Sequence, residues 1–162
     1  MYNATMKIAI GSDHAGFELK EKIKQKLAAS GLEVADQGTN NAAESVDYPD
    51  FARAVGEAVA GGKADKGILC CGSGIGMAIT ANKIPGIRAA NVSTEAEAEL
   101  SRQHNDANVL ALGQRLLEPD YALVIVDKWL ATKFSGGRHQ QRVEKIAQIE
   151  KEERAFAADS RR

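Results

Sequence analysis

The sequence has none of the features that mark a membrane-spanning, secreted or strongly charged protein. Its 162 residues carry a net charge of −1 at pH 7. A near-neutral charge argues against binding to nucleic acid or to a membrane surface. No apolar stretch approaches the roughly 18 residues that span a bilayer. Residues 1–5 also lack the basic-then-apolar pattern of a signal peptide. We therefore expect no nucleic acid and no membrane among its partners.

Cysteine is also scarce, and its two copies, Cys70 and Cys71, are adjacent. Neighbouring residues of a strand point to opposite faces of a sheet, so these thiols are poor disulfide partners. Free thiols are typical of a reducing compartment, and we expect a cytoplasmic protein. Spacings such as Cys-x-x-Cys or His-x-x-x-His are missing as well, so we predict no metal site.

What the chain does contain is an alternation of short apolar runs with longer amphipathic stretches. Such alternation predicts a parallel sheet covered by helices on both faces. We expect one α/β domain over residues 1–162, a Rossmann-like three-layer sandwich with a five-stranded parallel sheet. Its core should span about 6–150, with the C-terminal helix and a frayed tail beyond. Strands are expected at 6–11, 32–35, 68–71, 87–92 and 109–112, and helices at 17 to about 30, 48–60, 76–83, 94–104, 119–132 and 138–157.

Several polar residues directly follow predicted strands. They are the Asp13-His14 pair, the stretch from Cys71 to Ser73, then Ser93 and Arg115. Ligands of open parallel sheets bind beyond the carboxyl ends of the strands. We therefore expect these residues to gather at one edge of the sheet and to form the site.

The glycine-rich turn at 72–76 follows an apolar strand and precedes a helix. Such a turn collects backbone N–H groups around one spot and favours an anion. Cys71 would lie at the strand tip beside it, where the helix dipole favours the thiolate. A thiolate next to an anion cradle is a catalytic arrangement. For Cys70 we expect only a small core residue.

Two glycine patterns invite a nucleotide-binding interpretation. The segment 11–16 has the glycine spacing of a P-loop, but Phe17 and Glu18 replace the required lysine and hydroxyl residue. In the second pattern, at 72–76, Met77 stands where a dinucleotide fingerprint needs glycine. We expect neither nucleotide site.

Two further groups keep two interpretations open. His14 and His104 are each flanked by polar residues, which suits either exposed loops or acid–base chemistry near neutral pH. Arg138 and Arg142 are one helical turn apart, which suits either a solvated basic face or a phosphate clamp.

Five segments together resemble ribose-5-phosphate isomerase type B, a family that also contains galactose-6-phosphate and allose-6-phosphate isomerases. The resemblance covers about residues 6–150. It is carried by Gly-Ser-Asp-His-Ala-Gly-Phe at 11–17, Asp-Tyr-Pro at 47–49, Cys-Gly-Ser-Gly-Ile-Gly at 71–76, Ser-Arg-Gln-His-Asn-Asp-Ala-Asn-Val-Leu at 101–110 and Gly-Gly-Arg-His-Gln-Gln-Arg at 136–142.

The resemblance implies an aldose–ketose isomerase that needs no metal and no organic cofactor. Its catalytic base is a cysteine, Cys71, because the glutamate of the alternative branch falls on Met77. The family's ring-opening histidine corresponds to His104, and its hydroxyl residue after the base corresponds to Ser73. The remaining positions are substrate contacts at Asp13, His14, Tyr48 and Asn105, phosphate contacts at Arg115, Arg138 and Arg142, and an anion hole over Gly72, Ser73, Gly74, Ile75 and Gly76.

The function implied is interconversion of D-ribose 5-phosphate and D-ribulose 5-phosphate, in the non-oxidative pentose phosphate pathway, through a cis-enediolate. The implied assembly is a homodimer with sites shared between chains, and a tetramer stays open. Two alternatives remain: an isomerase of allose 6-phosphate or galactose 6-phosphate, and a phospho-sugar-binding regulatory domain. The loop at 36–47 and the room around Tyr48 would decide between five-carbon and six-carbon substrates.

Overall fold

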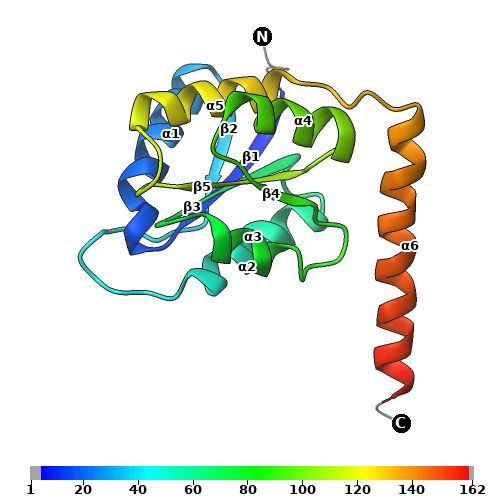
Figure 1. Cartoon of the computed structure of the whole chain (residues 1–162). Helices are drawn as coiled ribbons and strands as arrows, with labels where there is room; N and C mark the ends of the chain where they lie inside the picture. The colour runs from blue at the N-terminus through cyan, green and yellow to red at the C-terminus, as the bar shows by residue number, and fades with distance from the viewer. Residues whose placement is uncertain (1–4, 161–162) are drawn as a thin grey trace.

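The computed structural model describes residues 5–160 and has three layers, with a sheet between two layers of helices (Figure 1). The five strands pair in parallel in the order β2-β1-β3-β5-β4. This confirms the predicted α/β sandwich. The strands are β1 (Lys7–Ser12), β2 (Glu33–Asp36), β3 (Lys66–Cys71), β4 (Ala89–Asn91) and β5 (Val109–Gly113). The helices are η1 (His14–Gly16), α1 (Phe17–Ala29), α2 (Tyr48–Ala60), α3 (Ile75–Ala81), α4 (Glu95–Asn105), α5 (Pro119–Ala131) and α6 (Arg138–Asp159).

The third strand begins at Lys66 and not at residue 68, and three further expectations were wrong. The fourth strand is shorter than 87–92, because the N–H of Ile87 bonds to the Ile84 carbonyl in a turn. The third helix ends at Ala81, because the Asn82 side chain instead exchanges two hydrogen bonds with the backbone of Ala89. The tail expected to fray is helical as far as Asp159, and residues 161–162 lie outside the described part.

Each face of the sheet packs on its own apolar core. One core, under α1, α4 and α5, includes Ile10, Cys70 and Trp129. The other, under α2 and α3, includes Leu69 and Cys71. The adjacent cysteines therefore face opposite layers, as the alternation of a strand requires. Both are free thiols.

Helix α6 does not belong to either layer and stands beside the body of the molecule (Figure 1). Its first turn meets α4, and farther along the Glu150 carboxylate accepts a hydrogen bond from the N–H of Gly86 at 3.1 Å. Ile149 and Phe156 on this helix are 59% and 70% exposed. An exposed apolar row on a projecting helix is typical of an interaction surface. Within residues 5–160, no helix is both long and apolar enough to cross a membrane.

Candidate active site

A pocket of about 350 Å³ opens at the carboxyl edge of the sheet, where β1, β3 and β5 end. The predicted gathering of residues at this edge is confirmed for most of them. The pocket is lined by Asp13, His14, Ala15, Tyr48, Cys71, Gly72, Ser73, Gly76, Arg115 and Leu116. Ser93 also lies at this edge but does not line the pocket. It follows β4, the edge strand, which lies two places from β3 in the sheet, and its N–H bonds to Glu97 at the start of α4.

Cys71 is the nucleophilic group of this pocket. It ends β3, is 5% exposed, and receives a hydrogen bond on Sγ from the N–H of Gly74 at 3.0 Å. A backbone donor aimed at sulfur stabilises the thiolate more than the thiol. Burial raises the pKa of the Cys70 thiol well above its ordinary value, and Cys70 is fully buried on the other face of the sheet. Of the two cysteines, only Cys71 lines the pocket.

The turn after Cys71 depends on glycine at two positions. Gly74 has φ of +80° and caps α3, and a Cβ there would lie 2.2 Å from Asn91 Nδ2. At Gly76, a Cβ would lie 2.6 Å from the Tyr48 ring. Because Gly74 and Gly76 have no side chains, the turn can pack closely against its neighbours beside the pocket. Gly74 and Ile75 themselves do not line the pocket, and Ile75 is 53% exposed.

Ser73 lines the pocket with its hydroxyl held in the turn. Its Oγ accepts a hydrogen bond from the N–H of Ile75 at 3.3 Å. The hydroxyl proton therefore remains available for donation toward the pocket. Ser73 is thus placed to donate to a sulfur or a substrate oxygen beside Cys71.

Asp13 and His14 form the wall contributed by β1. Asp13 is 6% exposed and accepts a hydrogen bond from the N–H of Gly16 at 3.0 Å, which closes η1. His14 Nδ1 lies 3.2 Å from both the backbone nitrogen and the carbonyl oxygen of Val46, and its tautomer sets which of the two it bonds to. That bond fixes the orientation of the imidazole, and it comes from the C-terminal end of the 37–47 loop. Both side chains are therefore held before any ligand enters.

Arg115 and Tyr48 complete the rim. The N–H of Arg115 bonds to the Gly72 carbonyl at 3.0 Å, and a Cβ on Gly72 would lie 3.0 Å from the guanidinium. Tyr48 starts α2 and is 40% exposed, with its ring over Gly76. A guanidinium at the mouth of a pocket is suited to a phosphate group.

The remaining predicted residues lie elsewhere in the same chain. Helix α4 follows β4 and runs back to Asn105, just before β5 begins, so its last turn is at the amino edge of the sheet. The carbonyl of Asn105 accepts a hydrogen bond from Arg88, which precedes β4 at that edge. His104 stacks on His139 of α6, with ring centroids 4.1 Å apart and planes at 9°. One chain therefore does not bring His104 to Cys71.

Arg138 and Arg142 share the first turns of α6 with His139. The pKa of His139 is lowered, first by burial and then by the charges of His104, Arg138 and Arg142. This concentration of positive charge at a helix N-terminus is unfavourable by itself and favours an anion. The second group of predicted residues is thus an anion-seeking cluster, separate from the Cys71 pocket within one chain.

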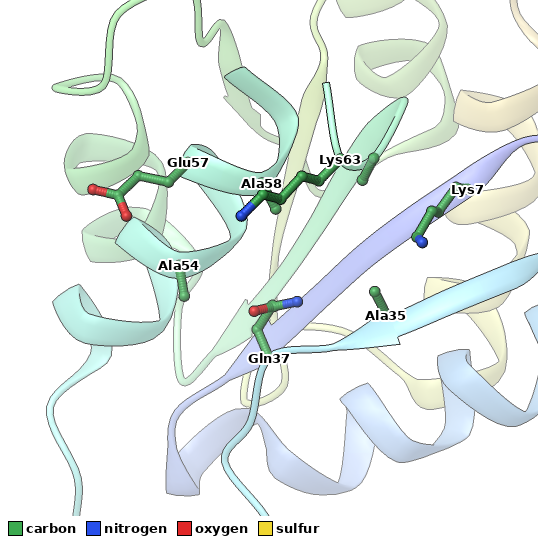
Figure 2. Close-up of a pocket in the computed structure, with 8 residues that line it drawn as sticks. Lys7, Ala35, Gln37, Ala54, Glu57, Ala58 and Lys63 are labelled. Carbon is green, nitrogen blue, oxygen red and sulfur yellow. The ribbon is translucent and has the colours of Figure 1, made fainter. Parts of the chain in front are cut away.

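A second pocket, of about 590 Å³, lies between α2 and the strands β1 and β2 (Figure 2). Alanines make half of its wall, and the polar groups come from Lys7, Gln37, Glu57 and Lys63. None of the predicted site residues lines it. In residues 5–160, no group of three or more His, Cys, Asp or Glu side chains is placed to hold a metal ion.

Three residues at the pocket were missed from the sequence. Ala15 and Leu116 line it, and Val46 orients His14 through its backbone. Leu116 is 64% exposed, which a leucine after a strand does not suggest. The two lining residues could have been found only as neighbours of the motif residues His14 and Arg115. Nothing in the sequence marks Val46.

A parallel sheet with a cysteine and a glycine turn at its carboxyl edge, ringed by histidine and arginine, defines an enzyme that acts on small anionic substrates. The family model described as Ribose/Galactose Isomerase matches residues 8–146. The chain belongs to this family, which confirms the resemblance carried by the five motifs.

Several known proteins are similar to this chain along almost their whole length. Ribose-5-phosphate isomerase B of Escherichia coli (strain K12) is 54% identical over 144 residues, 89% of this chain and 96% of that protein. The solved structure of ribose-5-phosphate isomerase B of Clostridium thermocellum has a TM-score of 0.89 and 56% identity, over 91% of this chain and 99% of that one. That of Mycoplasma genitalium, with bound ribulose-5-phosphate, has a TM-score of 0.86 and 44% identity, over 90% and 97%.

Proposed function

We propose that this protein is a single-domain enzyme that interconverts D-ribose 5-phosphate and D-ribulose 5-phosphate, with Cys71 as the base. One observation carries the proposal: a nearly buried cysteine lines the pocket and accepts a backbone hydrogen bond on its sulfur. The substrate follows from similar proteins named ribose-5-phosphate isomerase B, one of them with ribulose-5-phosphate bound. Free thiols and a phosphorylated substrate support a cytoplasmic setting.

The central step is a proton transfer between neighbouring carbons of the open-chain sugar. The Cys71 thiolate takes the proton from C2, and the electrons of that bond form the C1–C2 double bond of a cis-enediol(ate). A proton then passes from O2 to O1, and the thiol returns its proton to C1 while the O2 electrons form the C2 carbonyl, which gives the ketose. Negative charge develops on oxygen, where N–H groups of the turn at 72–76 stabilise it. Because the N–H groups of Gly74 and Ile75 bond to Cys71 sulfur and Ser73 Oγ, we assign the oxygen to those of Gly72, Ser73 and Gly76.

The substrate enters mostly as a ring, so ring opening precedes isomerisation. We assign this step to His104 and Asp13, which move a proton between the ring oxygen and O1. His14 and Asn105 hold sugar hydroxyls, and Tyr48 lines the sugar site. Ser73 donates to the reacting oxygens or to the thiolate. Together these groups hold the open-chain sugar in a reactive geometry.

The phosphate is held by Arg115, Arg138 and Arg142. The guanidinium of Arg115 lies at the pocket rim, over Gly72. The other two begin α6, one helical turn apart, where the surrounding cations favour an anion. Binding energy from the phosphate, which does not react, keeps the open chain in place for the chemistry.

Each site is built from two chains of a homodimer. Cys71 and His104 lie at opposite edges of one sheet, so a second chain must bring His104 to the pocket. The surfaces that this requires are exposed and apolar: Ile75 and Ile79 on α3 beside the pocket, and Ile149 on α6. A groove of about 670 Å³ between α6 and residues 82–89 offers a seat for the partner beside Asn105. Isologous pairing of such faces yields a two-fold dimer.

The test is conversion of ribose 5-phosphate by the purified protein with EDTA present, beside allose 6-phosphate and galactose 6-phosphate. We expect ribulose 5-phosphate to form, with the pentose preferred in kcat/KM. A preference for either hexose phosphate would instead support a six-carbon isomerase. Tight phosphate binding without any conversion would support a regulatory binding domain and overturn the proposal.

A further inference from the structure

The one fully buried charged side chain among the described residues lies outside the pocket. Lys20 of α1 has a side-chain exposure of 0%. Its Nζ donates to Asp36 Oδ1 at 2.8 Å and to the Thr39 carbonyl at 2.7 Å, and the ring of Phe17 lies 5.3 Å away. A buried ammonium is costly unless it is fully paired, as this one is. Such an arrangement calls for an explanation in the structure around it.

The acceptors of Lys20 belong to the start of the loop that follows β2. Asp36 ends that strand, and its Oδ1 also accepts a hydrogen bond from the N–H of Gly38 at 2.9 Å. Burial would raise the pKa of Asp36, but hydrogen bonds from Lys20 and Lys24 hold it below its ordinary value. The carboxylate therefore remains ionised and keeps the loop closed onto α1.

The same loop residues hold the end of β1. The N–H of Ser12 bonds to the Gly38 carbonyl at 2.7 Å, and the N–H of Thr39 bonds to the Ser12 carbonyl at 2.7 Å. Ser12 immediately precedes the pocket residue Asp13. At its other end the loop reaches Val46, whose backbone hydrogen-bonds to His14 Nδ1. One loop thus supports both wall residues, and Lys20 ties down its first turn.

We propose that Lys20 is a positioning residue for the isomerisation: by clamping Thr39 and Asp36 it fixes Ser12, and so sets Asp13 and His14 against the sugar. This inference rests on the proposed function of the pocket. Lys20 does not touch the substrate. Its effect passes through two backbone hydrogen bonds to the residue next to Asp13.

The neighbouring Lys24 supplies a matched control. Its Nζ also bonds to Asp36, at 2.7 Å, and to Glu21, at 2.6 Å, but it makes no bond to Thr39 and is 31% exposed. Lys20→Met and Lys24→Met remove the same charge from the same network. Only the first removes the donor to the Thr39 carbonyl.

The experiment compares the two variants with wild type in steady-state kinetics and in amide hydrogen exchange. For Lys20→Met we expect kcat to fall by roughly 10- to 100-fold, since misplacement of about 1 Å can cost about that much. The Ki of inorganic phosphate should stay within about twofold, because the arginines that bind it are outside this network. Exchange at Ser12 and Thr39 should accelerate. For Lys24→Met we expect no change in any of the three.

A fall in kcat shared equally by both variants would overturn the proposal, because it would reflect lost charge and not position. Unchanged kcat in Lys20→Met would also overturn it. If Lys20→Met does not fold, adding Asp36→Asn removes the carboxylate charge that Lys20 balanced, and the double variant should show the same loss of kcat. If wild type converts no sugar phosphate, the proposed function fails. Exchange at Ser12 and the NMR shift of His14 then decide the positioning role by themselves.

Discussion

The backbone N–H of Gly74 points at the sulfur of Cys71 from 3.0 Å. The donor belongs to the residue whose positive φ turns the chain into α3, so the turn and the thiolate site are one structure. Because the donor is a backbone group, its position relative to the sulfur is set by the path of the turn. Any change that alters this path should therefore lower the activity.

Gly74→Ala should lower both stability and turnover. Its φ of +80° costs an alanine about 1–2 kcal/mol, and the new Cβ would also lie 2.2 Å from Asn91 Nδ2. Gly62→Ala is the matched control, with φ of +71° and no atom within 4 Å of its Cβ position. Both variants should melt at lower temperature, but only Gly74→Ala should lose kcat. Equal kcat in both variants would contradict the role given to the turn.

Arg138→Ala and Arg142→Ala should raise KM for ribose 5-phosphate by roughly 10- to 100-fold, since a charge-assisted hydrogen bond contributes about 1.5–3 kcal/mol. kcat should change much less, because the phosphate does not react. Lys151→Ala removes a charge from the exposed surface of the same helix and should leave KM unchanged. An arginine variant with normal KM and lost turnover would argue against the phosphate clamp.

Mixing two inactive variants tests the shared site. Cys71→Ala and His104→Ala should each lack activity as homodimers. In a hybrid dimer, one site combines Cys71 of the His104→Ala chain with His104 of the Cys71→Ala chain and is intact. The other site carries both substitutions and is inactive. Random exchange in a two-fold dimer should then restore about a quarter of the wild-type rate. If the mixture stays inactive although chain exchange is shown by mass spectrometry, Cys71 and His104 do not act across the interface.

Lys66 gives a prediction about stability that is independent of activity. Burial, followed by the charge of Arg102, lowers the pKa of Lys66 from 10.5 to about 8. Between these two pH values the unfolded chain holds a proton that the folded chain has released, so stability should rise with pH across that window. Lys66→Met should lack this rise. Urea unfolding of both proteins at pH 7, 8, 9 and 10 checks it, and a constant difference between them would contradict it.

Much of the fold could be predicted because each element carries a local signal. Helix α2 begins at Tyr48-Pro49 and ends at Ala60, as proline and the following glycines indicated. The boundary errors at Asn82 and Ile87 come from side-chain and turn hydrogen bonds between residues several positions apart. Periodicity alone does not carry such information.

The lining of the pocket could be predicted where it follows strands, whereas the contacts of the loop after β2 could not. Cys71, Asp13 and Arg115 meet because parallel strands end together. The contact between His14 and Val46 joins residues 32 positions apart, and Val46 contributes only backbone atoms to it. The identity of its side chain therefore gives no signal. Lys20 did have a signal, since it lies three and seven residues before the buried Ile23 and Leu27 on one helix face.

The position of His104 follows from topology. A helix that returns across a parallel sheet ends at the amino edge, away from ligands. His104 ends such a helix, so its expected part in the chemistry already required a second chain.

The central claim is that Cys71 moves the proton, and the most direct test compares Cys71→Ala with Cys70→Ala in the conversion of ribose 5-phosphate. Both variants remove one buried thiol from the same strand, on opposite faces of the sheet. We predict that Cys71→Ala loses turnover by on the order of 10²- to 10⁴-fold, the usual contribution of a general base. Cys70→Ala should keep near-normal kcat and lose only stability. Equal activity in the two variants would contradict the account and show that another group is the base.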